Sequence, residues 1–237
     1  MRQEVVLERL TRREVRQRLE SGALQAAVIA VGSIEQHLEH LPLCHDIQSA
    51  FWVAEQAALS LFPRVIVTVP VSIGISEHWM WAKGTLTAKP GSWLAVVFDA
   101  VDSLFRHGIR HVLILNGHAG NVAPVQGVLR QWRLYFARQY PGSNLQFASY
   151  WDFIPREIAD QVLQTKRLPG HAQEFETAIA LHAFPDLVRH DAIADQDDPE
   201  PRLATSEQGR QLAEIVISKL VAFLSDMMDG TIKMPVD

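Results

Sequence analysis

Four short apolar runs, rich in β-branched residues, most constrain the fold of this chain. They occupy residues 26–31, 65–71, 111–115 and 145–150. Runs of this length and composition are typical of strands that are buried on both faces of a sheet. Stretches with helical periodicity separate them, at about 47–61, 92–107 and 122–138. Strands that alternate with helices predict an α/β fold, a three-layer α/β/α sandwich with a mostly parallel central sheet.

Signals for helix ends and loops frame this alternating core. Thr11 and Glu14 have the spacing of a capping box, and Gly22 follows the apolar positions, so a first helix is expected between them. The acidic, proline-containing stretch 195–201 precedes only a last helix at about 205–226. Because that remainder is too small for a second core, the stretch is interpreted as a surface loop, and residues 1–237 are expected to form one domain.

Charge and composition narrow the class of function. The 237 residues include 22 Lys and Arg against 27 Asp and Glu, a formal net charge of −5. Proteins that bind nucleic acid or a membrane surface need a basic face, so neither partner is expected. The first residues are charged, no apolar run is long enough to span a membrane, and Cys44 is the single cysteine. These features favour a cytoplasmic protein without disulfides.

Residues that can bind a metal ion follow three of the predicted strands. In chain order these candidates are Glu35, His37, Asp46, His118, His171, Glu174 and Glu176. Ligands of α/β proteins collect beyond the carboxyl ends of the parallel strands, which meet at one edge of the sheet. Carboxylates and imidazoles are the ligands that borderline divalent metals prefer. The pattern therefore predicts a metal-dependent hydrolase.

Several of these residues also have an ordinary structural interpretation. Asp46 can cap the helix that begins near it, and His40 and His45 can be solvated loop residues. Glu174 and Glu176 can form an exposed helix start, where negative charge suits the helix dipole. Other chemistries have less support, because the chain has no GxSxG elbow, no phosphate-binding P-loop and no GxGxxG segment after a strand.

Short motifs in this chain resemble those of the creatininase (creatinine amidohydrolase) family. The matching segments are Gly32-Ser33-Ile34-Glu35-Gln36-His37, His40-Leu41-Pro42-Leu43 with Asp46, Gly84-Thr85, Asn116-Gly117-His118 with Asn121, and His171 with Glu174 and Glu176-Thr177. They occur in the family's order across residues 5–190. The resemblance implies an α/β/α hydrolase with a dinuclear metal centre, a small-molecule amide substrate and a homo-oligomeric assembly, often a hexamer.

The resemblance also implies a role for each matching residue. Glu35 and His118 correspond to ligands of one metal and His37 to a ligand of the other, with Asp46 as the bridge. Creatinine-cleaving members have a further Glu where this chain has Gly120, so Glu174 is expected to supply the remaining ligand. The two ions are expected to be zinc, manganese or iron. His171 corresponds to the family's catalytic histidine and is expected to move a proton to the leaving nitrogen.

The chain departs from the family pattern at four positions close to these motifs. Leu38 replaces the usual Gly, Glu39 a commoner Pro or His, Lys83 a Pro, and Gln173 a Gly. The substrate is expected to contact four further residues, namely Trp151, His78, Trp79 and His40. The predicted reaction is hydrolysis of a non-peptide C–N bond, an amide or cyclic amide, by a metal-bridged hydroxide. A deformylase, a peptidase and a non-catalytic metal-binding relative are the alternatives.

Overall fold

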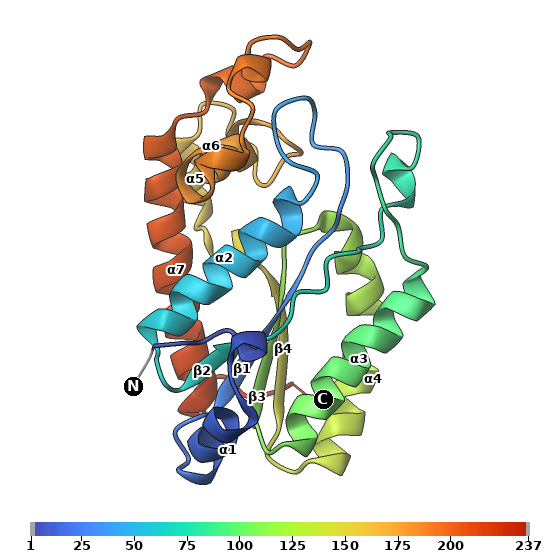
Figure 1. Ribbon diagram of the computed structural model, residues 1–237, viewed down its shortest axis with the longest axis vertical. Coiled ribbons are helices and arrows are strands. Elements are labelled where there is room, and N and C mark those ends of the chain that lie inside the picture. The colour runs from blue at the N-terminus through green and yellow to red at the C-terminus, as the bar shows by residue number, and fades with distance from the viewer. Residues whose placement is uncertain (1–2, 236–237) are drawn as a thin grey trace.

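The computed structural model describes residues 3–235, and a parallel sheet forms the centre of this part of the chain. Its four strands are β1 (Ala26–Val31), β2 (Val65–Val67), β3 (His111–Asn116) and β4 (Asn144–Ser149). They lie in the order β2-β1-β3-β4, so β1 and β3 are the central strands (Figure 1). Ala26 pairs with Val65 on one side and with His111 on the other.

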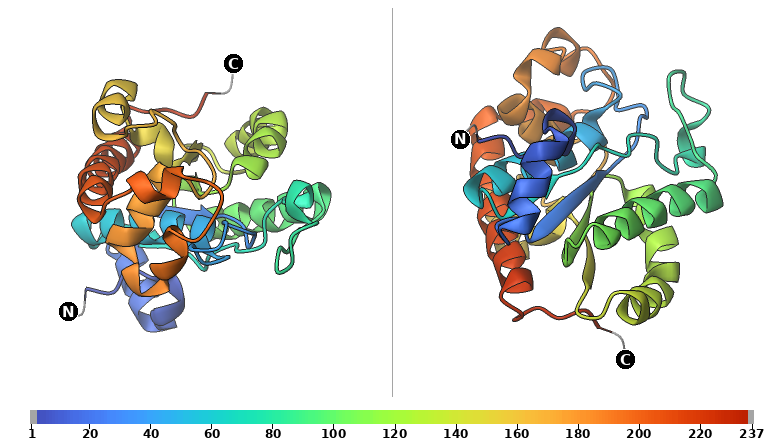
Figure 2. Two further views of the ribbon diagram at one scale, coloured as in Figure 1. Left: turned by 90° about the horizontal axis from the view of Figure 1, so that it is seen from above. Right: turned by 60° about the horizontal axis from the view of Figure 1, so that its bottom comes forward.

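Helices cover both faces of the sheet, which confirms the predicted three-layer arrangement. On one face lie α2 (His45–Ser60) and α7 (Ser206–Met228), and on the other α3 (Pro90–Arg106) and α4 (Val122–Gln139) (Figures 1 and 2). Three shorter helices complete the layers: α1 (Arg12–Glu20), α5 (Arg156–Val162) and α6 (Glu174–Ala183). Among the described residues, no helix is long and apolar enough to cross a membrane.

Two hydrophobic cores lie back to back across the sheet, because successive residues of a strand face opposite sides. Val28 and Leu113 pack with α2 and α7 in one core. Ile29 and Ile114 pack with α3 and α4 in the other. The central strands are therefore buried on both faces, as their continuous apolar sequences predicted.

Most predicted element ends agree with the structure, and the second strand is the main exception. The capping box of Thr11 and Glu14 is formed at the start of α1. The predicted loop at 195–201 is a loop over residues 195–199, whereas Glu200 and the buried Pro201 begin a short 3-10 helix, Glu200–Leu203. The β2 strand ends at Val67, four residues earlier than expected. Pro70 lacks an N–H group and cannot continue the ladder, although Val71 still forms an isolated bridge with Val31.

Two glycines allow the loops after the central strands to touch the first turn of α2. A Cβ atom at Gly117 would lie 2.1 Å from the carbonyl oxygen of Asp46, and one at Gly32 would lie 2.5 Å from Cα of Ile47. Both distances are far shorter than a van der Waals contact. The absence of side chains at these positions places Asp46 directly beyond the carboxyl ends of β1 and β3.

The close approach at Gly117 and the open space around Gly127 predict opposite effects on stability for Gly→Ala substitutions at these two positions. Gly117→Ala should lower the free energy of unfolding by about 1–3 kcal/mol, because backbone must move to admit the methyl group. Gly127→Ala is the control, since no atom lies within 4 Å of the added Cβ in the exposed part of α4. It should stabilise the protein by about 0.5–1 kcal/mol through helix propensity. Urea unfolding of both variants tests this, and equal stability of the two would contradict the packing described.

Candidate metal centre

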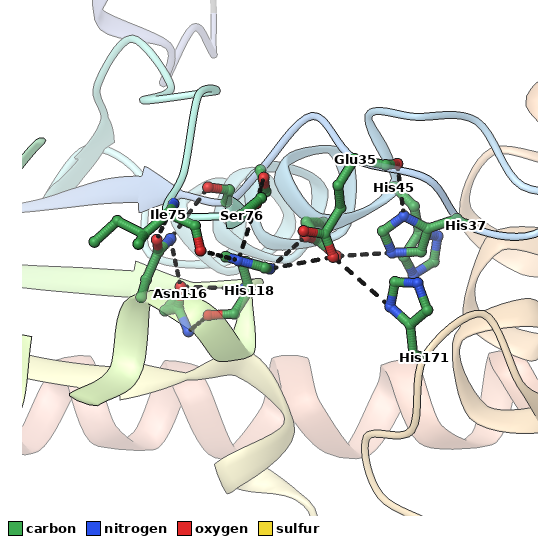
Figure 3. Close-up of polar contacts among 12 residues, drawn as sticks. Glu35, His37, His45, Ile75, Ser76, Asn116, His118 and His171 are labelled. Atoms are coloured by element: carbon green, nitrogen blue, oxygen red, sulfur yellow. Dashed lines mark hydrogen bonds and ion pairs between the residues drawn. The ribbon is translucent and has the colours of Figure 1, made fainter. Parts of the chain in front are cut away.

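Side chains from four segments converge beyond the carboxyl ends of β1 and β3. The loop after β1 supplies Glu35 and His37, the first turn of α2 supplies Asp46, and the turn after β3 supplies His118. Glu176, in the first turn of α6, completes this cluster. Figure 3 shows the side chains of Glu35, His37 and His118 turned toward one another, with His171 beside them. All five members of the cluster are buried.

Asp46 lies between the two imidazoles of the cluster. Its Oδ1 is 2.9 Å from Nε2 of His37, and its Oδ2 is 2.9 Å from Nδ1 of His118. Glu35 Oε1 is 3.4 Å from the same nitrogen of His118, and Glu176 Oε2 is 3.8 Å from Nε2 of His37. Each imidazole thus faces two carboxylates.

Backbone carbonyls determine which nitrogen of each imidazole can bind a metal. Nδ1 of His37 is 3.1 Å from the carbonyl oxygen of Glu35, and Nε2 of His118 is 3.1 Å from that of Ile75. A carbonyl oxygen only accepts, so each ring donates its N–H there. In the neutral imidazole the other nitrogen, which faces Asp46, then has a free lone pair. This arrangement is usual around histidines that ligate metals.

Unpaired polar atoms show that the cluster fits a bound cation. Among the described residues, His37 Nε2, Asp46 Oδ2 and Glu35 Oε2 are buried without a hydrogen-bond partner. The first two lie 2.9 Å from an ionic partner, yet their geometry is not that of a hydrogen bond. Nitrogen and oxygen lone pairs that approach closely without pointing at each other can share a metal ion between them. Ligand atoms of His37, Asp46 and Glu176 all lie within 4.8 Å of one another, as do those of Glu35, His37 and His171.

The buried charges shift the pKa values of the cluster strongly. Burial lowers the pKa of His37, but Asp46 and Glu176 outweigh it and raise the pKa to about 9. His118 behaves in the same way beside Asp46 and Glu35, and its pKa rises to about 10. Burial raises the pKa of Glu176 to about 8, whereas the two imidazoles hold that of Asp46 well below its usual range. Without a cation, protons therefore compensate the carboxylates.

The expectation that Glu174 joins this cluster is wrong. Its Oε1 accepts hydrogen bonds from the N–H of Gln164 (2.9 Å) and from Nε2 of Gln208 (2.8 Å), and its Oε2 accepts one from the N–H of Thr165 (2.8 Å). Glu174 therefore anchors the segment after α5. Two residues along a helix correspond to a rotation of about 200°, so Glu176 points to the opposite side of α6 and into the cluster.

His40 and His45 are buried, and neither is a solvated loop residue. His40 Nε2 is 2.8 Å from Oγ1 of Thr177 and its Nδ1 is 3.1 Å from Nε2 of Gln196, so it ties the loop after β1 to α6. It does not line the reaction cavity described below, contrary to the expectation that it contacts the substrate.

Burial raises the pKa of the thiol of Cys44, the reverse of what a nucleophilic thiol needs.

A cavity of about 190 Å³ opens onto the cluster. Three of the residues expected to contact the substrate line it, namely His78, Trp79 and Trp151. His171 also lines it, and its ring stacks on Trp79 with centroids 4.5 Å apart and an interplanar angle of 18°. Burial and the neighbouring His37 lower the pKa of His171 to about 4, against the opposing effects of Glu35, Asp46 and the Gln36 carbonyl. His171 is therefore neutral near pH 7.

A larger cavity of about 760 Å³ lies next to this reaction cavity. Three of the four departures from the family pattern line it, namely Leu38, Glu39 and Lys83. Lining residues of the two cavities touch at two places: Gln36 with His171, and Trp79 with the largely exposed Trp81. The residues that depart from the family pattern therefore gather around this larger cavity.

Similarity to known proteins agrees with this geometry. The Creatininase family model, described as creatinine amidohydrolase, matches residues 8–203. Creatinine amidohydrolase of Pseudomonas putida is 27% identical over 209 residues, 82% of this chain and 78% of the relative. Mycofactocin precursor peptide peptidase of Mycolicibacterium smegmatis is 27% identical over 170 residues, 70% of this chain and 61% of the peptidase, so the chain spans about three-fifths of that relative. A crystal structure of creatininase superposes with a TM-score of 0.83 at 22% identity, covering 95% of this chain and 98% of that one.

The match to the family model, together with the candidate metal centre, defines a metal-dependent hydrolase that acts on carbon–nitrogen bonds. The chain belongs to the creatininase family. Solved creatininases with the same fold include a variant of the Zn–Zn type and a manganese form.

The two glutamates of α6 give a matched pair of variants. Glu176→Gln should weaken zinc binding at least about tenfold with little change in stability of the metal-free protein. Glu174→Gln should leave zinc binding unchanged but lower stability by about 1–3 kcal/mol, because its amide would place a donor against the backbone N–H donors. Zinc titration and thermal unfolding of both variants distinguish the roles. Loss of zinc affinity in Glu174→Gln alone would contradict the assignment.

Metal binding should displace protons from the cluster. At pH 7 the raised pKa values leave His37 and His118 protonated in the metal-free protein, and a ligand nitrogen must be deprotonated. Zinc affinity should therefore rise with pH up to about 9–10, the range in which these imidazoles lose their protons. Calorimetric titration at pH 7 in buffers of different ionisation enthalpy should show release of about three protons, two from these imidazoles and one from Glu176, whose pKa is raised to about 8. Binding without proton release would rule out these histidines as ligands.

Proposed function

We propose that this protein hydrolyses the C–N bond of a small amide or cyclic amide with two divalent metal ions bound in the cluster. The observation that carries the proposal is the buried set of three carboxylates and two correctly oriented imidazoles beneath a small cavity. The relatives named above, a creatinine amidohydrolase and a peptide peptidase, both cleave bonds of this chemical type.

The geometry supports a specific division of the ligands. Glu35 and His118 would hold one ion, His37 and Glu176 the other, and Asp46 would bridge them through its two oxygens. The charges nearly balance as well, because two divalent cations bring +4 against −3 from the carboxylates, and a partly buried site tolerates the remaining +1. Gly120, which stands where creatinine-cleaving relatives have a Glu, cannot contribute. A Cβ there would lie 2.4 Å from Nε2 of His118, so no larger side chain fits without moving that ring.

The metals and the protein would have separate parts in the reaction. When bound, such ions lower the pKa of a water molecule and polarise a carbonyl oxygen. The walls formed by Trp79, Trp151 and His78 would hold a flat amide above the cluster and limit the access of water. In the overall reaction, water adds to the carbonyl carbon, the C–N bond breaks, and the leaving nitrogen takes a proton from that water. His171 is the neutral imidazole at the cavity wall and is the proposed catalytic histidine.

The residues around the site and the size of the larger cavity indicate which substrates to expect. Creatinine-cleaving relatives have a second pocket tryptophan in the segment matching 166–170, where this chain has none. With Gly120, this departure leads us to expect that creatinine is a poor substrate. A second candidate reaction is cleavage of a peptide. The larger cavity of about 760 Å³ next to the reaction cavity favours it, because that cavity would accept the rest of a peptide substrate.

A substrate screen tests the proposed function directly. Zinc- or manganese-loaded protein should release amine from at least one of four substrate groups, namely simple amides, formamides, cyclic amides and ureas, and short peptides. Asp46→Ala should lose both metals and the activity, because the proposed bridge is removed. Asp99→Ala, at an exposed position of α3, should retain both. Absence of turnover from a fully loaded protein would favour a non-catalytic metal-binding relative, and full metal content in Asp46→Ala would overturn the bridge.

A further inference from the structure

Gln36 connects the loop after β1 to the proposed catalytic histidine. Its Nε2 lies 2.7 Å from Nε2 of His171, and its Oε1 accepts a hydrogen bond of 3.0 Å from the N–H of Leu38. The backbone N–H of Gln36 is itself bound to Oγ1 of Thr85 at 3.1 Å. Both ends of this side chain, and the backbone that carries it, are therefore held.

The Leu38 contact decides the orientation of the Gln36 amide. A backbone N–H only donates, so the atom of Gln36 that faces it must be the oxygen. The reverse orientation would put two donors 3.0 Å apart at Leu38. The amide nitrogen of Gln36 consequently faces His171, where it can only donate.

The backbone at Leu38, which donates this hydrogen bond, has an unusual conformation. Leu38 has a φ of 55°, in the left-handed region, where the family usually has glycine. A non-glycine residue there costs roughly 1–2 kcal/mol. The backbone of the residues before position 38 sets the direction of its N–H, so the donor that orients Gln36 is independent of the side chain at position 38.

This orientation also fixes the tautomer of His171. Its Nε2 accepts from Gln36 and must carry a lone pair, so the neutral ring carries its proton on Nδ1. Nδ1 faces the cluster, 3.7 Å from Oε1 of Glu35 (Figure 3). Stacking on Trp79 and contact with the His37 ring, 4.6 Å between centroids, hold the ring plane.

We propose that Gln36 is a positioning residue that makes His171 a hydrogen-bond donor, with Nδ1–H directed at the carbonyl oxygen of the substrate. This inference rests on the proposed function and changes one part of it. A neutral His171 held in this tautomer has no lone pair facing the cavity, so it neither takes up a proton there nor binds a metal through Nδ1. It stabilises the negative charge that develops on oxygen when water adds to the carbonyl.

The tautomer can be measured without any substrate. In zinc-loaded protein labelled with ¹⁵N-histidine, two-bond correlation spectra distinguish Nδ1–H from Nε2–H, and His171→Asn identifies the signals of this ring. We expect Nδ1–H in the wild type. Gln36→Glu should convert His171 to Nε2–H, because a carboxylate oxygen would now accept from that nitrogen. Nε2–H in the wild-type protein, with Nδ1 free or bound to zinc, would overturn the proposal.

Two further variants test the role of the donor in the reaction. In His171→Asn the amide nitrogen takes the approximate place of Nδ1 and can donate but cannot transfer protons near neutral pH. We expect it to keep at least about tenfold more kcat than His171→Ala, which should lose about 10²–10³-fold, as expected for the loss of one oxyanion donor. Equal loss in the two variants would contradict the donor role.

A matched pair of Gln→Glu variants compares the loss of the Gln36 donor with the same substitution at an exposed position. Gln36→Glu should lower kcat by about 10²-fold with KM changed less than about threefold, since the lost contact acts mainly in the transition state. Gln126→Glu, at an exposed position of α4, should leave both constants unchanged. Unchanged kcat in Gln36→Glu would overturn the positioning role. If no amide is hydrolysed at all, the proposed function fails, whereas the ¹⁵N spectra still decide the tautomer.

Discussion

The carboxylate of Asp46, buried between two imidazoles, is the contact on which the arrangement of the site depends. It occupies the start of α2, and glycines at positions 32 and 117 let the loops after both central strands close against that helix turn. Glu35 and Glu176 bring two further acidic groups into the same buried space. Burying ionised carboxylates is costly unless cations or protons compensate them. The buried carboxylates therefore lower the stability of the fold, and a bound divalent metal ion would offset that unfavourable free energy. This links stability to metal binding.

Regular secondary structure and backbone hydrogen bonds support this cluster. The strands that lead into it, β1 and β3, are the central pair of the sheet and pack against helices on both faces. Backbone carbonyls orient His37 and His118, and a backbone N–H orients Gln36. Backbone atoms in hydrogen-bonded segments move less than side chains, so these contacts hold the side chains in position before any ligand binds. Preorganisation of this kind is the usual source of electrostatic stabilisation in enzymes.

Sequence reasoning predicted the sheet, the layers and most of the cluster because those depend on strong local signals. Apolar runs specified the central strands, and the motif spacing brought Glu35, His37, Asp46 and His118 to one edge of the sheet. It placed Glu174 in the cluster, where the structure has Glu176, because only the rotation of the helix separates the two residues. The matching segment itself held a usable signal, since it includes the pair Glu176-Thr177 as well as Glu174. The roles of His40 and Gln36 depend on long-range hydrogen bonds, which no local pattern encodes.

Anomalous diffraction from crystals of the zinc-loaded protein, recorded on both sides of the zinc absorption edge, tests the central claim most directly. The account predicts two zinc peaks in the cluster, with Asp46 in contact with both and Glu176 as a ligand of the ion that His37 holds. It also predicts that Glu174 keeps its hydrogen bonds to the backbone of residues 164 and 165. A single peak, or a zinc ion ligated by Glu174 in place of Glu176, would contradict it.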